Sequence, residues 1–144
     1  MTAAPDILGD VSEENVELAK RVQDAFNRGA LDEMLRHVSP DAEWQISENN
    51  PAARTLHGRD EIRAYLADWR DTVHGLYYEV SQYIDAGDSV VQVGTMTGRA
   101  GHGGPELTVP LAFVTYFADG VPVRTEEYLD VDVALRAAGV TAES

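Results

Sequence analysis

Three kinds of side chain in this 144-residue sequence could do chemistry: carboxylates, histidines, and a tyrosine among aromatic neighbours. The most informative carboxylate is Glu127, in a stretch with strand-like alternation. Burial in an apolar cavity would raise the pKa of Glu127 and let it exchange protons near neutral pH. Alternatively, Glu127 lies on a solvated face, or pairs with Arg124 or Arg99. Two sets compete for the inward face of this strand: Arg124, Glu126, Tyr128 and Asp130, or Thr125, Glu127 and Leu129.

Histidine is the second candidate for acid–base work, and His57 is the best placed of the four. It ends a polar loop just before a predicted helix, from which it could reach a cavity mouth as a general base. The other three histidines fall at a helix end or in connections, where a structural or solvated role is simpler. No two histidines have metal-ligand spacing, so we expect no metal.

Large aromatic residues form the third group. Tyr65 and Trp69 lie one turn apart on a predicted helix, and Trp44 and Phe113 lie on predicted strands. Residues at this spacing pack in a core or line a binding cavity, and in a hollow fold the two roles overlap.

Composition excludes several functions. The formal net charge is −14, and an acidic surface repels phosphate backbones and anionic lipid headgroups, so neither nucleic acid nor membrane is an expected partner. The chain has no cysteine, which rules out disulfides and thiolate chemistry. The glycine-rich segment 98–104 favours a hairpin loop over a phosphate cradle, and we expect no cofactor. The first ten residues do not resemble a signal peptide, which predicts a cytoplasmic protein.

The elements that must position these residues follow from hydrophobic periodicity. A helix is predicted from Ser12 to a stop at Gly29, followed by a shorter helix, a strand at 42–46 and a polar loop at 48–56. A third helix opens at Gly58, and a last short helix has Asp132 as its cap. Between these two helices the period changes to two, which predicts four strands at 76–84, 89–97, 107–117 and 121–130. Helices first and strands afterwards indicate an α+β fold.

Side-chain alternation suggests which strand residues face a cavity. Trp44 and Ile46 share a face of the first strand, and the other predicted lining residues are Val93, Thr95, Leu111 and Phe113, together with Trp69 from the third helix.

The order of elements, and several short phrases, resemble the SnoaL-like family of the nuclear-transport-factor-2-like superfamily. The phrases are Ala25-Phe26-Asn27-Arg28-Gly29, Ser39-Pro40-Asp41-Ala42-Glu43-Trp44, His57-Gly58-Arg59-Asp60-Glu61-Ile62 and Tyr128-Leu129-Asp130. The similarity predicts one domain over residues 12–140, with a flexible lead-in at 1–11 and a frayed tail at 141–144.

The resemblance implies a cone-shaped, strongly curved antiparallel sheet covered by three amino-terminal helices around a deep cavity, and a homodimer through the outer sheet face. Aligned by its terminal Tyr-Leu-Asp with the epoxide hydrolases of the superfamily, Glu127 falls where those enzymes point an acid into the pocket. This favours Thr125, Glu127 and Leu129 as the inward set.

Two departures leave the chemistry open. Ile46 and Phe113 stand where ketosteroid isomerases carry their two acids. The first hypothesis is an enzyme performing cofactor-independent acid–base chemistry, such as cyclisation, isomerisation, dehydration or epoxide opening, on a hydrophobic small molecule. Glu127 would be its proton carrier, and His57 or Tyr65 the catalytic partner. The alternative is a non-catalytic module that binds a small ligand or dimerises.

Overall fold

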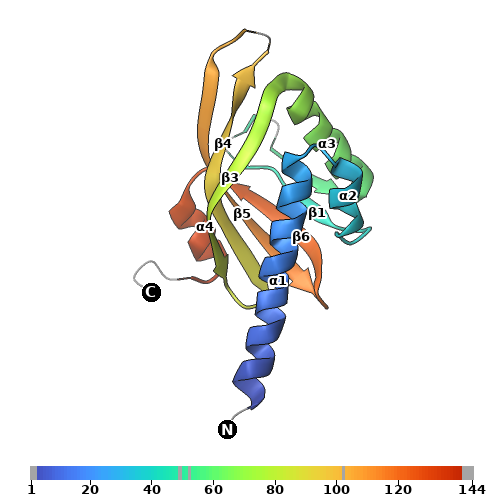
Figure 1. Cartoon of the computed structure of the whole chain (residues 1–144), viewed down its shortest axis with the longest axis vertical. Helices are drawn as coiled ribbons and strands as arrows, with labels where there is room; N and C mark the ends of the chain where they lie inside the picture. Colours follow the sequence, from blue (N-terminus) through green and yellow to red (C-terminus); the bar gives the residue numbers. More distant parts are fainter. Residues whose placement is uncertain (1–2, 49, 52, 102, 141–144) are drawn as a thin grey trace.

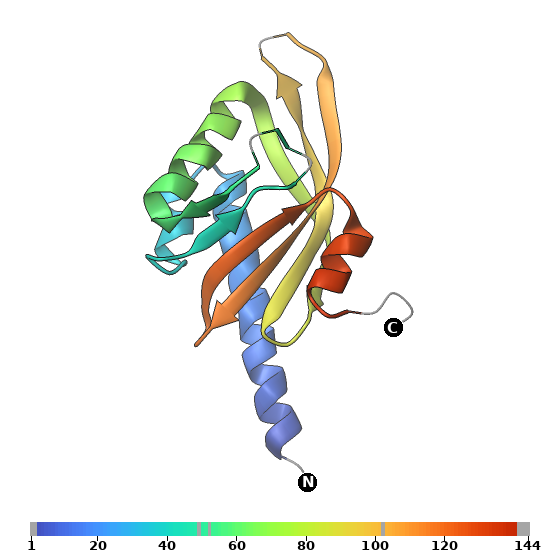
Figure 2. The ribbon, with the colours of Figure 1, turned by 180° about the vertical axis from the view of Figure 1, so that it is seen from behind.

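The chain forms one curved sheet with helices on both faces. The computed structural model describes residues 3–48, 50–51, 53–101 and 103–140. Within that part of the chain, six strands make the sheet in the order β2-β1-β6-β5-β4-β3. The three amino-terminal helices cover one face, here called the inner face, and a short last helix packs on the outer face (Figures 1 and 2). The predicted α+β cone is therefore confirmed.

The helices are α1 (Ala3–Asn27), α2 (Leu31–Arg36), α3 (Gly58–Thr72) and α4 (Val131–Ala137). The predicted start of α1 at Ser12 was wrong, because the serine and glutamates that suit a helix cap are also compatible with a helix interior. The cap of α4 is Asp130 instead of Asp132, since Asp130 Oδ1 accepts the Asp132 N–H at 2.9 Å. Residues 1–2 of the lead-in and the tail at 141–144 lie outside the described residues.

The strands are β1 (Glu43–Gln45), β2 (Thr55–His57), β3 (Val73–Asp85), β4 (Ser89–Ala100), β5 (Glu106–Ala118) and β6 (Val121–Tyr128). Strand β2 was missed by sequence reasoning, because three residues at the end of a polar loop show no alternation. The sheet is also mixed and not purely antiparallel. Strand β1 runs parallel to β6, with Trp44 opposite Thr125, and antiparallel to β2, with Trp44 opposite Leu56.

Two glycines on the inner face of β4 let β3 approach closely. A Cβ added to Gly94 would lie 2.2 Å from the carbonyl oxygen of Glu79, and one added to Gly98 would lie 2.4 Å from the side chain of Val73. Both distances are far below van der Waals contact, so no side chain fits. The register between β3 and β4 also shifts between Val80 and Gln82, as a β-bulge does. The sheet bends at this pair of strands.

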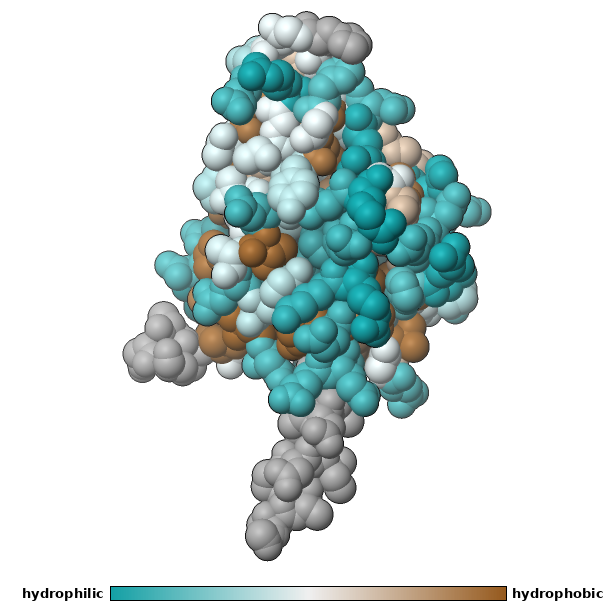
Figure 3. All heavy atoms as spheres, in the orientation of Figure 1, coloured by the Kyte–Doolittle hydropathy of each residue, from teal (hydrophilic) through white to brown (hydrophobic). Residues whose placement is uncertain are grey.

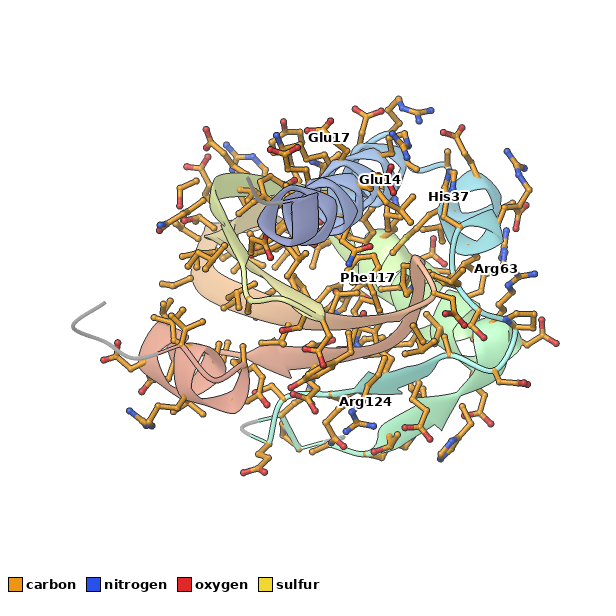
Figure 4. The ribbon with its side chains drawn as sticks, turned by 90° about the horizontal axis from the view of Figure 1, so that it is seen from below. Glu14, Glu17, His37, Arg63, Phe117 and Arg124 are labelled. Atoms are coloured by element: carbon orange, nitrogen blue, oxygen red, sulfur yellow. The ribbon has the colours of Figure 1, made fainter. Side chains whose placement is uncertain are left out.

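A polar side chain links helix α1 to the sheet, and it bonds to backbone groups of β3 as a neighbouring strand would. Asn27 Nδ2 donates to the Tyr78 carbonyl at 3.0 Å, and Asn27 Oδ1 accepts the Tyr78 N–H at 2.9 Å. The apolar side of α1 packs on the inner face around Phe26, and further along it contacts Phe117. Seen from below, Phe117 lies between α1 and the sheet, while Glu17 points away from it (Figure 4).

The molecular surface is mostly hydrophilic on the side of α1 and α3, with small apolar patches between polar side chains (Figure 3). None of the helices in the described ranges combines the length and apolar content needed to cross a bilayer.

We predict that Asn27→Ala lowers the free energy of unfolding by about 1–3 kcal/mol, because it leaves two backbone groups of β3 without their partner. Urea unfolding followed by circular dichroism measures the change. Glu17→Ala, on the exposed side of the same helix, is the control and should change it by less than about 0.5 kcal/mol. Equal effects of the two substitutions would contradict this role for Asn27.

Candidate functional site

The centre of the candidate site is the carboxylate of Glu127. Alternation along β6 places Thr125 and Glu127 on the inner face, with Glu127 opposite Phe113 of β5. Only 4% of Glu127 is exposed. A carboxylate is rarely buried to this extent without partners.

Three hydrogen-bond donors from three different segments meet this carboxylate. Trp44 Nε1, from the neighbouring strand β1, donates to Glu127 Oε2 at 2.5 Å. The Tyr65 hydroxyl, from α3, donates to the same oxygen at 2.8 Å. The Ser47 N–H, just after β1, donates to Glu127 Oε1 at 3.2 Å. The arginines considered as partners are engaged elsewhere: Arg124 with Glu43 and Glu126 on the outer face, and Arg99 with the Gly104 carbonyl.

Burial and hydrogen bonding act on Glu127 in opposite directions. Burial raises the pKa of this carboxyl group, and the hydrogen bonds from Trp44, Tyr65 and Ser47 lower it, with burial the larger effect. Burial also raises the pKa of Tyr65, and the neighbouring Glu127 raises it further. Tyr65 therefore stays a neutral phenol that donates, while Glu127 is poised to change its charge closer to neutral pH.

An aromatic cluster surrounds the pair. The Trp44 ring packs edge-on against Phe113 with ring centres 5.7 Å apart, and lies 6.3 Å from Tyr65. Tyr65 in turn lies 5.2 Å from Trp69, one turn further along α3. These ring contacts restrict the orientation of the two side chains that donate to Glu127, Trp44 and Tyr65.

Glu127 forms part of the wall of a cavity of about 280 Å³, here called the wide cavity. Its volume is near the lower end of the roughly 300–1,000 Å³ typical of small-molecule sites. The lining of the wide cavity comes from the end of α3, the segment after β1 and the part of the sheet that carries the long β4–β5 hairpin. Figure 2 shows how these elements are arranged. Its lining residues are Ser47, Asn50, Trp69, Val73, Leu76, Met96, Thr97, Leu107, Val109, Leu111, Glu127 and Leu129.

A second space of about 50 Å³, the narrow cavity, lies on the α1 side of the cluster. Trp44, Phe113 and Thr125 line it, together with Gln23 and Gln92, whose side chains are hydrogen-bonded to each other at 3.0 Å. Trp69 borders both cavities.

The structure brings together most of the residues expected at a site. Glu127, Tyr65 and Trp44 are in direct contact. Trp69, Leu111 and Leu129 line the wide cavity, and Phe113 and Thr125 line the narrow one. Ile46 is fully buried in the core and lines neither cavity.

Val93 and Thr95 do not line either cavity, and their predicted place was wrong. Val93 packs under α4 on the outer face, and alternation puts Thr95 on the same side. The inner face of β4 carries Gln92, Gly94 and Met96 instead. The sequence misleads here because α4 buries apolar residues on the outer face, so the more apolar set of β4 is not the set that faces the cavity.

The fold does not place His57 near the Glu127 carboxylate. Along β2, Leu56 points into the core, so His57 points outward, and 66% of its side chain is exposed. Its Nδ1 lies 3.4 Å from Glu43 Oε2 on the outer face.

Sequence reasoning missed two polar lining residues, Ser47 and Asn50. Both belong to the polar loop after β1, whose composition indicated a rim without indicating which side chains turn inward. In the described part of the chain, no group of three or more histidine or acidic side chains is arranged to hold a metal ion.

Residues 19–125 match the family model of the SnoaL-like domain. The chain belongs to this family. The match ends two residues before Glu127, so the central carboxylate of this SnoaL-like protein lies outside the segment that defines the relationship.

Comparison with solved structures supports the same fold. An NTF2-like protein of unknown function from Burkholderia pseudomallei K96243 is 24% identical, with a TM-score of 0.73, over 85% of this chain and 95% of the other. TerC, crystallised with polyporic acid, is 22% identical, with a TM-score of 0.72, over 88% and 98%. A Jannaschia sp. CCS1 protein assigned as a SnoaL-like polyketide cyclase is 20% identical, with a TM-score of 0.73, over 90% and 94%. A search among curated proteins finds no match.

We predict that the stability of the protein depends on pH through Glu127. The unfolded carboxyl titrates near its ordinary pKa of 4.5, and the folded one has a raised pKa. Protonated Glu127 therefore stabilises the fold at low pH, and this contribution is lost as the pH rises through the folded-state pKa. Glutamine does not titrate, so the stability of Glu127→Gln relative to wild type should increase as the pH rises from the ordinary pKa of 4.5 through the raised pKa of folded Glu127. Urea unfolding at each pH measures it, and a constant difference would count against the assignment.

We also predict that Trp44→Phe raises the pKa of Glu127 further, because it removes a hydrogen bond that favours the charged form. Carbon-13 NMR of the glutamate carboxyl groups measures the pKa directly. Trp69→Phe is the matched control, since Trp69 borders the cavity without a described bond to Glu127. The same pKa change in both variants would show that the indole N–H has no specific effect.

Proposed function

We propose that this SnoaL-like protein is an enzyme that transfers protons on a small, largely apolar molecule bound in the wide cavity, with Glu127 as the proton carrier. The observation that carries the proposal is a carboxylate only 4% exposed, with a raised pKa, in the wall of a mostly apolar cavity. Catalytic acids and bases work best with pKa values near the operating pH, and burial is one of the ways to reach them.

The three hydrogen-bond donors give the two oxygens of this carboxylate different roles. Trp44 and Tyr65 hold Oε2, so that oxygen is fixed in place. Oε1 accepts one described hydrogen bond, from the Ser47 N–H, and an ionised carboxylate has about four acceptor positions in all. One position on Oε1 is left to take a proton from a substrate and to return it. Trp44 and Tyr65 are thus positioning residues in this proposal, and His57 has no part in it.

The family relationship supports small-molecule chemistry without choosing the reaction. The Jannaschia relative is assigned as a polyketide cyclase, which fits proton transfer at carbon. Ile46 and Phe113 are apolar and buried at the two positions where the resemblance to ketosteroid isomerases implies acids, so a mechanism through Glu127 would differ from theirs.

The same two replacements favour the second candidate, a module that binds a small ligand without converting it. A homodimer through the outer sheet face stays a prediction, as does a cytoplasmic location. Helix α4 covers part of that outer face, and half-exposed Tyr77 of β3 is among the residues a partner copy would meet.

The test is hydrogen–deuterium exchange at carbon. Wild-type protein is incubated in D₂O with cyclic ketones and conjugated enones, and proton NMR follows the loss of C–H signals next to the carbonyl group. We expect one class to exchange, and Glu127→Gln to slow the exchange by a factor of about 10²–10⁴, the usual contribution of a general base.

Glu79→Gln is the control, because Glu79 is exposed on the opposite face of the sheet. Exchange that persists in Glu127→Gln would contradict the role of Glu127. Saturable binding without exchange by any compound would favour the second candidate.

A further inference from the structure

The described lining of the wide cavity carries a negative charge with no positive charge beside it. Among the twelve described residues that line it, Glu127 is the only one with a charged side chain, and none of the twelve is a lysine, arginine or histidine. No charged side chain of the described residues contributes to the pKa of Glu127, which is set by burial and by three neutral donors. The nearby cation, Arg54, is exposed and acts on Tyr65 from the surface. An anionic ligand would find no cationic side chain among the described lining residues and would be repelled by ionised Glu127.

The hydrogen bonds around Glu127 indicate which kind of ligand group would complete its environment. An indole N–H and a backbone N–H can only donate, and the Tyr65 hydroxyl donates to Oε2. These partners favour the ionised carboxylate, while burial opposes it. A ligand that brings a positively charged N–H donor to the remaining position on Oε1 would satisfy both the hydrogen bonding and the charge.

The other walls suit the hydrocarbon part of such a ligand. Met96, Leu111 and Trp69 are apolar, and the face of an indole ring also attracts a cation. Val109 and Leu129 are 38% and 41% exposed, so this edge of the cavity meets solvent and forms an apolar mouth.

We propose that the wide cavity binds small hydrophobic amines in their protonated form, with the ammonium group on Glu127 Oε1 and the hydrocarbon part between Met96 and the mouth. This ligand class goes beyond the proposed reaction, because it concerns binding alone and requires no turnover. A failure to bind amines therefore does not affect the deuterium-exchange test, and a failure of deuterium exchange does not affect the amine-binding test.

The experiment compares three ligands of similar shape and different charge by isothermal titration calorimetry: benzylamine, benzyl alcohol and benzoate. We expect benzylamine to bind at least about tenfold more tightly than benzyl alcohol, the ratio of one charge-assisted hydrogen bond, and benzoate not to bind. The affinity for benzylamine should increase as the pH rises above about 4.5 and Glu127 ionises. Benzyl alcohol should not gain affinity in that range.

Three variants distinguish binding in the cavity from binding to the acidic surface. Glu127→Gln should lose about tenfold or more of the affinity for benzylamine and keep that for benzyl alcohol, whereas Glu79→Gln should change neither. Val109→Trp, at an exposed position that tolerates a larger residue, should fill the mouth and weaken both ligands. It serves as the second test if Glu127→Gln does not fold.

The proposal is overturned if benzoate binds as well as benzylamine, or if benzylamine binding is unchanged in Glu127→Gln and Val109→Trp. Binding that disappears at high salt would also overturn it, because surface attraction to a chain of net charge −14 is screened by salt and a buried pair is much less so.

Discussion

The parallel pairing of β1 with β6 is the constraint on which the candidate site depends. Only Glu43–Gln45 and Arg124–Glu126 take part, yet this short register puts Trp44 beside Glu127. Side-chain bonds on both faces of the sheet stabilise this pairing. On the outer face Arg124 bonds to Glu43 at 2.6 Å and to Glu126 at 2.9 Å, which links the strands, and on the inner face the indole bonds to the carboxylate.

The two neighbouring glutamates of β6 show how the environment decides the behaviour of one residue type. Glu126 faces outward, where an arginine and the hydroxyls of Tyr116 and Tyr128 surround it. Glu127 faces inward, and its hydrogen-bond donors among the described residues are all neutral. An ion pair keeps a carboxylate charged, whereas neutral donors in an apolar cavity leave its charge sensitive to pH and to what the cavity holds.

Sequence patterns predicted the elements well and the pairing of elements poorly. Periodicity located the helices and the four long strands because each has a face that must be apolar. It could not find β2, which is three residues long, nor the parallel contact of β1 with β6, which depends on residues about 80 positions apart. Inward placement of Glu127 came from family resemblance, since alternation alone allowed either face. The face of β4 was misjudged because α4 buries Val93 from outside.

The glycines of β4 limit the positions at which substitutions can reshape this cavity. Gly94 and Gly98 are held by the backbone and side chains of β3, so any larger residue would separate the two strands. The close approach of β3 and β4 therefore constrains the curvature of this wall. Variation in ligand preference has to arise at replaceable neighbours such as Met96 and Leu111, whose side chains can change in size while the strand path stays the same. A substitution that changes the ligand preference of this protein is then a change of wall lining, and the shape of the sheet persists.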